Sequence, residues 1–132
     1  MEQFTLKTHA QSEMIDITGE VRAILRKKSV NNGICYVFVP HTTAAVTINE
    51  NADPDVIRDI LMELDKKIPL YDNYRHREGN SAAHIKASLV GSSEMVFVEK
   101  GDLVLGTWQS LFFCEFDGPR RRNVFVSLIP GI

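Results

Sequence analysis

The sequence ICYVFVP, residues 34–40, decides the fold class. Its first six residues are β-branched, aromatic or otherwise apolar, which is typical of a strand buried on both faces. Pro40 ends that strand because proline has no N–H for a sheet hydrogen bond. Similar strand patterns occupy residues 4–8, 14–17, 44–49, 94–99, 103–105, 110–116 and 123–129. We therefore expect a largely antiparallel sheet or sandwich within an α+β fold.

Two to three helices complete the expected fold. Thr18 is a candidate N-cap for the first helix, and the turn at residues 31–33 is expected to end it. Asp53-Pro54 predicts a second helix, since the carboxylate accepts from free amides and proline suits the first helical position. Residues 81–90 form the third. The second helix is expected to bury an apolar stripe of four residues, Val56, Ile60, Leu61 and Leu64.

Length and composition indicate one domain over residues 1–132. The chain is 44% hydrophobic and 24% charged, which argues against intrinsic disorder. A net charge of −2 predicts no general affinity for nucleic acid, and no apolar run is long enough to cross a membrane. Cys35 and Cys114 lie in apolar strands and are interpreted as buried free thiols. We expect a cytoplasmic protein.

Three of the four histidines, His41, His76 and His84, lie in the segments richest in polar chemistry. A neutral imidazole binds metals and also acts as an acid or base near pH 7. The spacing of these histidines matches no metal motif, however. Ordinary hydrogen-bonded histidines are the simpler interpretation.

Carboxylates are the next candidates. Glu50 lies between a strand and a helix start, a position that is exposed and rigidly supported. Glu78 lies close in sequence to His76 and His84. Glu115 interrupts an aromatic strand, and alternation along that strand predicts that it faces solvent.

A cationic turn contains Arg120 and Arg122, and Lys86 lies on the helix that carries His84. Guanidinium groups match phosphate in a forked geometry, so the turn is a candidate phosphate clamp; a solvated sheet edge is the alternative. Trp108 is expected in the core, with stacking on a heteroaromatic ring as the alternative.

Three blocks of sequence resemble the YjbQ family, which is also called secondary thiamine-phosphate synthase. They are HTTAAVTINEN at residues 41–51, NSAAHIKASLVG at residues 80–91, and LGTWQ with EFDGPR at residues 105–109 and 115–120. The resemblance extends over nearly the whole chain in the same order. Where the second block often has an aspartate before the asparagine, this chain has Glu78-Gly79-Asn80.

The resemblance implies a small α+β domain that assembles as a homotrimer and joins a hydroxymethylpyrimidine diphosphate to a thiazole phosphate, releasing pyrophosphate. It also implies a divalent metal, with zinc as a candidate, held by His41, His76 and His84. Glu50, Glu78 and His84 are then the candidate acid–base or orienting groups.

Lys86, Arg120 and Arg122 would neutralise the charge that grows on a departing pyrophosphate. The same groups suit two other functions. One is a metal-dependent hydrolase of a small phosphorylated metabolite, and the other is a trimeric ligand- or metal-binding protein without catalysis. Further pocket residues are expected from the three blocks, namely Asn49, Asn80, Thr107, Trp108 and Gln109.

Overall fold

The computed structural model describes residues 1–131, which form eight strands and three helices. The elements are β1 (Glu2–Lys7), β2 (Glu13–Asp16), α1 (Thr18–Lys28), β3 (Gly33–Phe38), β4 (Ala44–Glu50), α2 (Pro54–Lys67), α3 (Ser81–Val90), β5 (Ser93–Glu99), β6 (Asp102–Leu103), β7 (Gln109–Glu115) and β8 (Arg121–Pro130). Each expected strand is present, with bounds shifted by no more than two residues. The predicted α+β fold class is confirmed.

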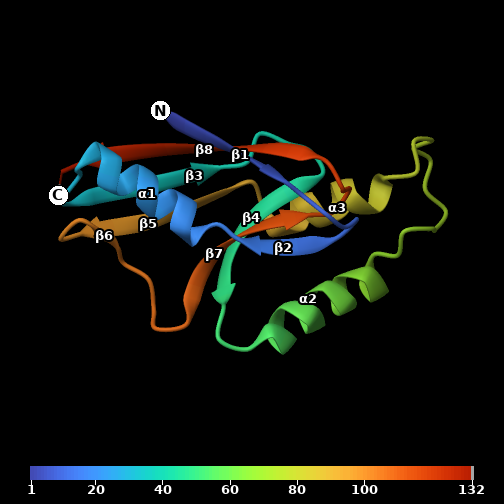
Figure 1. Ribbon diagram of the computed structural model, residues 1–132. Coiled ribbons are helices and arrows are strands. Elements are labelled where there is room, and N and C mark those ends of the chain that lie inside the picture. The colour runs from blue at the N-terminus through green and yellow to red at the C-terminus, as the bar shows by residue number, and fades with distance from the viewer. Residues whose placement is uncertain (132) are drawn as a thin grey trace.

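The strands form two antiparallel sheets. The larger has the order β1-β8-β3-β5-β6 and the smaller the order β2-β7-β4 (Figure 1). The main core lies between these sheets and α1, where Val21, Leu25, Val37, Phe113 and Val124 are at most 1% exposed. Pairing between distant segments, such as β1 with β8, closes the domain.

The prediction that β3 is buried on both faces is wrong. Cys35 and Val37 point into the core, whereas the side chains of Tyr36 and Phe38 alternate with them and are each 42% exposed. The residues of this strand are apolar on both faces, but α1 and the smaller sheet pack against only one of them. The outer face of the larger sheet therefore presents aromatic side chains.

The second helix begins as predicted, because the Asp53 carboxylate accepts a hydrogen bond of 2.9 Å from the amide of Asp55. The prediction for the first helix is wrong at both ends. Thr18 does not cap α1; its hydroxyl accepts from the amide of Leu111 in β7. The helix ends at Lys28, because the next residue, Ser29, adopts the left-handed conformation at φ 54° before the expected turn is reached.

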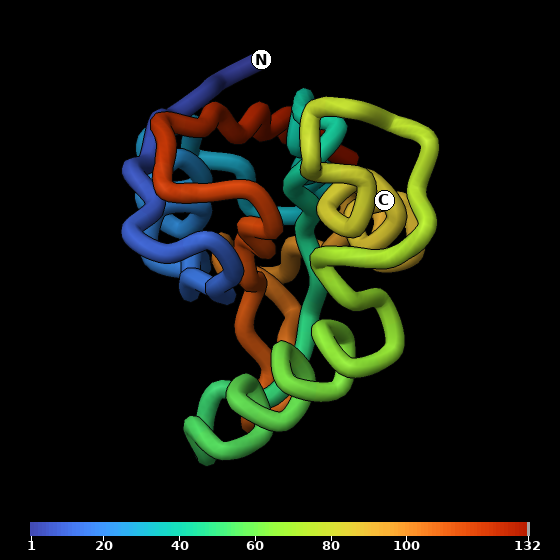
Figure 2. The backbone as a smooth tube through the Cα atoms, turned by 90° about the vertical axis from the view of Figure 1, so that its right-hand side faces the viewer, coloured from blue at the N-terminus to red at the C-terminus, as the bar shows by residue number. Residues whose placement is uncertain are grey.

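The expected burial of the α2 stripe is also wrong, since none of the α2 residues is fully buried. Leu61 and Leu64 are half-buried against a second cluster that includes Ala83, Cys114 and Phe116. Figures 1 and 2 show α2 standing away from the sheets. A single chain thus leaves much of this amphipathic helix uncovered.

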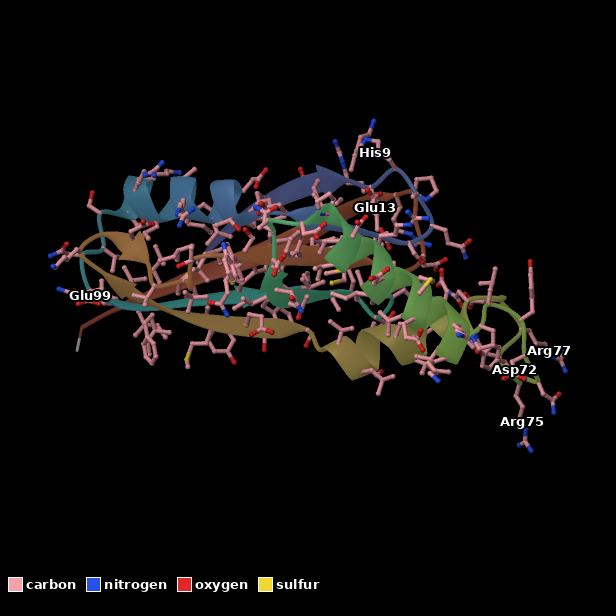
Figure 3. All side chains as sticks on the ribbon, turned by 90° about the horizontal axis from the view of Figure 1, so that it is seen from below. His9, Glu13, Asp72, Arg75, Arg77 and Glu99 are labelled. Atoms are coloured by element: carbon pink, nitrogen blue, oxygen red, sulfur yellow. The ribbon has the colours of Figure 1, made fainter. Side chains whose placement is uncertain are left out.

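The loop between α2 and α3 extends well beyond the sheets (Figure 1). Asp72, Arg75 and Arg77 point outward at its far end, whereas His9 lies beside Glu13 in another part of the molecule (Figure 3). No helix within residues 1–131 combines the length and apolar character that crossing a bilayer requires.

Candidate functional site

His41 lies where β3 leaves the larger sheet. The register that pairs Phe38 with Phe125 would, if continued, set Pro40 opposite Asn123. Proline ends β3, so β8 has no backbone partner at this position. The imidazole of His41 supplies the hydrogen-bond acceptor there instead. Its Nε2 atom accepts a hydrogen bond of 2.9 Å from the backbone N–H of Asn123.

A fully buried ion pair lies beneath this histidine, between Glu115 of β7 and Arg122 of β8, which are 0% and 2% exposed. The guanidinium binds both carboxylate oxygens through Nε and Nη2. The Arg122 Nη2 atom also donates to the Thr43 hydroxyl at 2.8 Å, two residues after His41. This pair therefore fixes the segment that carries His41.

The prediction that Glu115 faces solvent is wrong. Its carboxylate also accepts from the Thr8 hydroxyl at 2.8 Å and from the amide of Asp117 at 3.0 Å. Burial opposes ionisation, but these hydrogen bonds and that of Arg122 outweigh it, and the pKa of Glu115 lies below its ordinary value. A charged residue inside an aromatic strand, seven residues before an arginine, was the available sequence signal for this pair.

The third helix places His84 across a hollow from His41. The hollow has a volume of about 330 Å³ and includes the side chains of Thr42 and Ser88 in its lining. His84 also contacts His76 of the preceding loop edge to face, with ring centroids 5.4 Å apart. The Nε2 atom of His76 lies 3.8 Å from a carboxylate oxygen of Glu78. The structure thus brings the predicted histidines to one region of the surface.

A second hollow, of about 500 Å³, adjoins the first, and His41, Thr42 and Ser92 line both. Arg120 and Arg122 also line this second hollow. Of the predicted histidines, His41 therefore faces part of the predicted cationic turn, whereas His84 lines only the first hollow and His76 lines neither. Of the two arginines, Arg122 already has its guanidinium engaged by the buried carboxylate.

Arg120 is held less tightly. Its guanidinium donates to the backbone carbonyl and the carboxylate of Asp117, and this side chain remains 49% exposed. The same carboxylate accepts from the side-chain amide of Asn80 at 2.9 Å. The Asn80 Oδ1 atom is buried and has no hydrogen-bond partner within residues 1–131. This edge of the site therefore offers the partly exposed Arg120 guanidinium to a ligand.

Lys86 lies apart from the hollow, although only one residue separates it from His84. A helix turns about 200° over two residues, so the two side chains leave α3 on opposite sides. The ammonium of Lys86 is buried, pairs with Asp65 of α2 and lies 5.8 Å from the ring centroid of Phe116. The structure uses this lysine to attach α2 to the domain.

Glu50 lies at the far end of β4 from His41. Six residue steps along that strand amount to about 20 Å, so one chain does not bring Glu50 to the histidines. It lines a separate hollow of about 510 Å³ with four of the five predicted pocket residues, all except Asn80, namely Asn49, Thr107, Trp108 and Gln109. The expectation of a core tryptophan is wrong, since Trp108 is 65% exposed.

The three predicted metal ligands do not form a three-histidine site in this geometry. Within residues 1–131, no group of three or more His, Cys, Asp or Glu side chains is placed to hold a metal ion. His41 differs from the other two because the lone pair of its Nε2 atom already accepts from a backbone amide. We therefore derive no chemical step through a metal.

Electrostatics keep His41 neutral. Burial lowers the pKa of this imidazole, and the positive charge of Arg122 lowers it further. Protonation of Nε2 would also break the hydrogen bond from Asn123. The His41 ring is thus a neutral polar group beside the positive charges of Arg122 and Arg120.

These features define a small antiparallel α+β domain with a histidine-lined surface site, and comparison with known proteins assigns it to a family. The chain belongs to the UPF0047 protein YjbQ-like family, whose model matches residues 2–131. It is similar to the UPF0047 protein YugU of Bacillus subtilis, with 51% identity over 94% of this chain and 95% of that protein. A UPF0047 protein of Methanocaldococcus jannaschii is 49% identical over 96% of this chain and 92% of its own length.

Solved structures agree with this assignment. An uncharacterised YjbQ/UPF0047 protein from Clostridium acetobutylicum has 55% identity and a TM-score of 0.96, covering 98% of this chain and all of that one. A hypothetical protein from Aeropyrum pernix has 36% identity and a TM-score of 0.94, covering 98% of both chains. These names identify a family and state no activity.

Proposed function

We propose that the protein is an enzyme that acts on a small phosphorylated molecule in the paired hollows around His41. The observation that carries this proposal is the convergence of two imidazoles, several hydroxyls and the Arg120 guanidinium on adjoining hollows. Neutral N–H and O–H donors beside a partly free guanidinium suit phosphate oxygens. The buried Glu115–Arg122 pair holds this surface in place.

The reaction we propose is of the thiamine-phosphate synthase type. The thiazole nitrogen attacks the methylene carbon of hydroxymethylpyrimidine diphosphate, a C–N bond forms, and the C–O bond breaks with its electron pair leaving on pyrophosphate. Charge grows on that leaving group, so fixed donors beside it lower the barrier. Arg120 and the imidazoles of His41 and His84 are the groups of this chain that would supply them.

The divalent metal, zinc included, stays a prediction. The rings of His76 and His84 are neighbours, and we propose that a cation binds this pair, with water or substrate as its other ligands. Zinc content of the purified protein tests the proposal directly. His76→Ala and His84→Ala should lose the metal, whereas His9→Ala, which replaces a histidine that lines neither hollow, should retain it.

The activity test uses the purified protein with both precursors, with and without added divalent cations. We expect thiamine phosphate and pyrophosphate in equal amounts, and loss of both products in His84→Ala but not in His9→Ala. Product at the level of a protein-free blank would refute the transferase. Release of inorganic phosphate from either precursor alone would instead identify a hydrolase, and stoichiometric binding without product would identify a binding protein.

We further propose that the chain assembles as a homotrimer through the outer face of the larger sheet. Register places Tyr36 beside Met95 on that face, and exposed apolar patches of this kind usually mark interfaces. Five of its apolar side chains are between 42% and 57% exposed, namely Tyr36, Phe38, Met95, Phe97 and Ile129.

Light scattering coupled to size-exclusion chromatography tests the trimer. We expect three times the chain mass for the parent protein and a smaller species for Phe97→Glu. Exposed Leu89 of α3 offers a matched control, because Leu89→Glu adds the same charge outside the sheet face. A parent protein that elutes as a monomer would refute the assembly.

We propose a cytoplasmic location. Cys35 and Cys114 are both free, and unpaired thiols are typical of a reducing compartment. Cell fractionation with antibody detection tests this location.

A further inference from the structure

The hydrogen bond at His41 determines which ring nitrogen carries the proton. A neutral imidazole has one N–H and one lone pair. Because Nε2 accepts from the backbone N–H of Asn123, the lone pair is on Nε2 and the proton is on Nδ1. Nδ1 has no hydrogen-bond partner within the part of the chain that the structure describes.

We infer that His41 is a hydrogen-bond donor to an anionic ligand oxygen through Nδ1–H, and that it is not a metal ligand. This inference rests on the proposed function, since it assigns a role within the same site. A metal binds the lone pair of an imidazole nitrogen, and neither nitrogen of His41 has a free one. The histidine set expected from the family resemblance therefore divides into one donor, His41, and one neighbouring pair, His76 and His84.

A flipped His41 ring, with Nε2 no longer facing Asn123, would lose a backbone hydrogen bond. Rotating the ring to free Nε2 would leave the Asn123 N–H of β8 without its partner at the point where β3 has left the sheet. An unpaired backbone N–H away from water carries the full penalty of its lost hydration. The Thr43 contact with Arg122 holds the segment two residues further along. The backbone thus selects the tautomer.

The charges around the ring identify the ligand class. Arg122 and Arg120 are the cations that act on His41, and Glu115 is the nearby anion. The Glu115 carboxylate is fully buried, and its oxygens are already engaged by the Arg122 guanidinium, the Thr8 hydroxyl and the Asp117 amide. What faces the hollows is therefore positive charge and neutral donors, which suit the oxygens of a phosphate or diphosphate group. Burial and Arg122 also keep the ring neutral, so that it donates without adding a charge.

Nitrogen-15 NMR of the full-length protein tests the tautomer directly. Long-range proton–nitrogen spectra of histidine-labelled protein distinguish a protonated nitrogen from one with a lone pair, and His41→Asn assigns the His41 signals. We expect a protonated Nδ1 and an unprotonated Nε2. Pyrophosphate should shift the His41 Nδ1–H signal, whereas zinc should shift the signals of His76 and His84 first.

Side-chain replacements test the role independently of the spectra. The amide nitrogen of asparagine reaches the position of Nδ1, whereas that of glutamine reaches the position of Nε2. We expect His41→Asn to bind pyrophosphate within a few-fold of the parent protein. His41→Ala and His41→Gln should bind it ~10- to 100-fold more weakly, the range for a lost hydrogen bond to a charged group. Zinc affinity should be unchanged in all three variants.

The inference would be overturned by a proton on Nε2, by zinc coordinated by a His41 nitrogen, or by pyrophosphate binding that His41→Gln preserves and His41→Asn destroys. These results do not depend on turnover. If the protein binds pyrophosphate through His41 but converts neither thiamine precursor, the proposed reaction fails while the role of His41 stands. Pyrophosphate that leaves the His41 signals unmoved would refute the donor role itself.

Discussion

Replacing one partner of the Glu115–Arg122 pair should destabilise the protein more than any surface change. Both side chains are at most 3% exposed, and they share two hydrogen bonds. Removing one member of a buried pair leaves an uncompensated charge and typically costs about 3–5 kcal/mol. For a domain of this size we expect Glu115→Gln to lower Tm by about 12–20 °C.

The double replacement Glu115→Leu with Arg122→Met separates the pair's net contribution from the cost of breaking it. Apolar substitutes of similar volume often match a buried ion pair in stability. We therefore expect the double variant to recover most of the loss, to within about 2 kcal/mol of the parent protein. The hydroxyls of Thr8 and Thr43 would lose their partners, which is why full recovery is not expected.

Urea unfolding followed by circular dichroism measures these differences, at one protein concentration because assembly adds to apparent stability. Arg121→Met is the matched control, since the neighbouring Arg121 is exposed. The reasoning would be refuted if Glu115→Gln cost less than about 1 kcal/mol, the range of a surface ion pair. It would also be refuted if the double variant lost the sum of the two single effects.

Three further predictions follow from the titratable groups. Burial raises the pKa of Cys35 to about 11 and that of Cys114 to about 12. Neither thiol should therefore react with a thiol reagent at pH 8 until the protein is unfolded. Rapid labelling of the native protein would contradict their burial. Because the pKa of His41 in the folded protein lies below its ordinary value of 6.5, the unfolded chain binds more protons, so Tm should fall as pH drops below 6.5. The slope should be smaller in His41→Asn, and equal slopes would exclude His41 as the cause. Asp65→Asn leaves the buried ammonium of Lys86 without its counterion and should cost about 1–3 kcal/mol in urea unfolding; an unchanged midpoint would mean that the pair does not hold α2.

The architecture was predictable because its signals are local. Alternating apolar residues predict strands, and Asp53-Pro54 predicts a helix start that the Asp53–Asp55 hydrogen bond confirms. The free, buried state of Cys35 and Cys114 also follows from their apolar strands. The predictions of burial were wrong where the exposure of one face of a strand depends on which distant segment packs against it, as with Tyr36 in β3.

The candidate site was predictable in part. The segments that carry His41, His76 and His84 do meet at one surface, and Arg120 shares a hollow with His41. Glu50 does not join them within one chain, because β4 keeps its two ends apart.

The sequence by itself determined the elements of this protein, their order and the family to which it belongs, because hydrophobic period, capping residues and turn residues act over a few positions. Tertiary structure alone decided that Glu115 is buried, that Lys86 binds Asp65, and that the Nε2 atom of His41 receives the N–H of Asn123. Each of these depends on a contact between distant parts of the chain. Burial and electrostatic environment are properties of such contacts, so short-range patterns do not contain them.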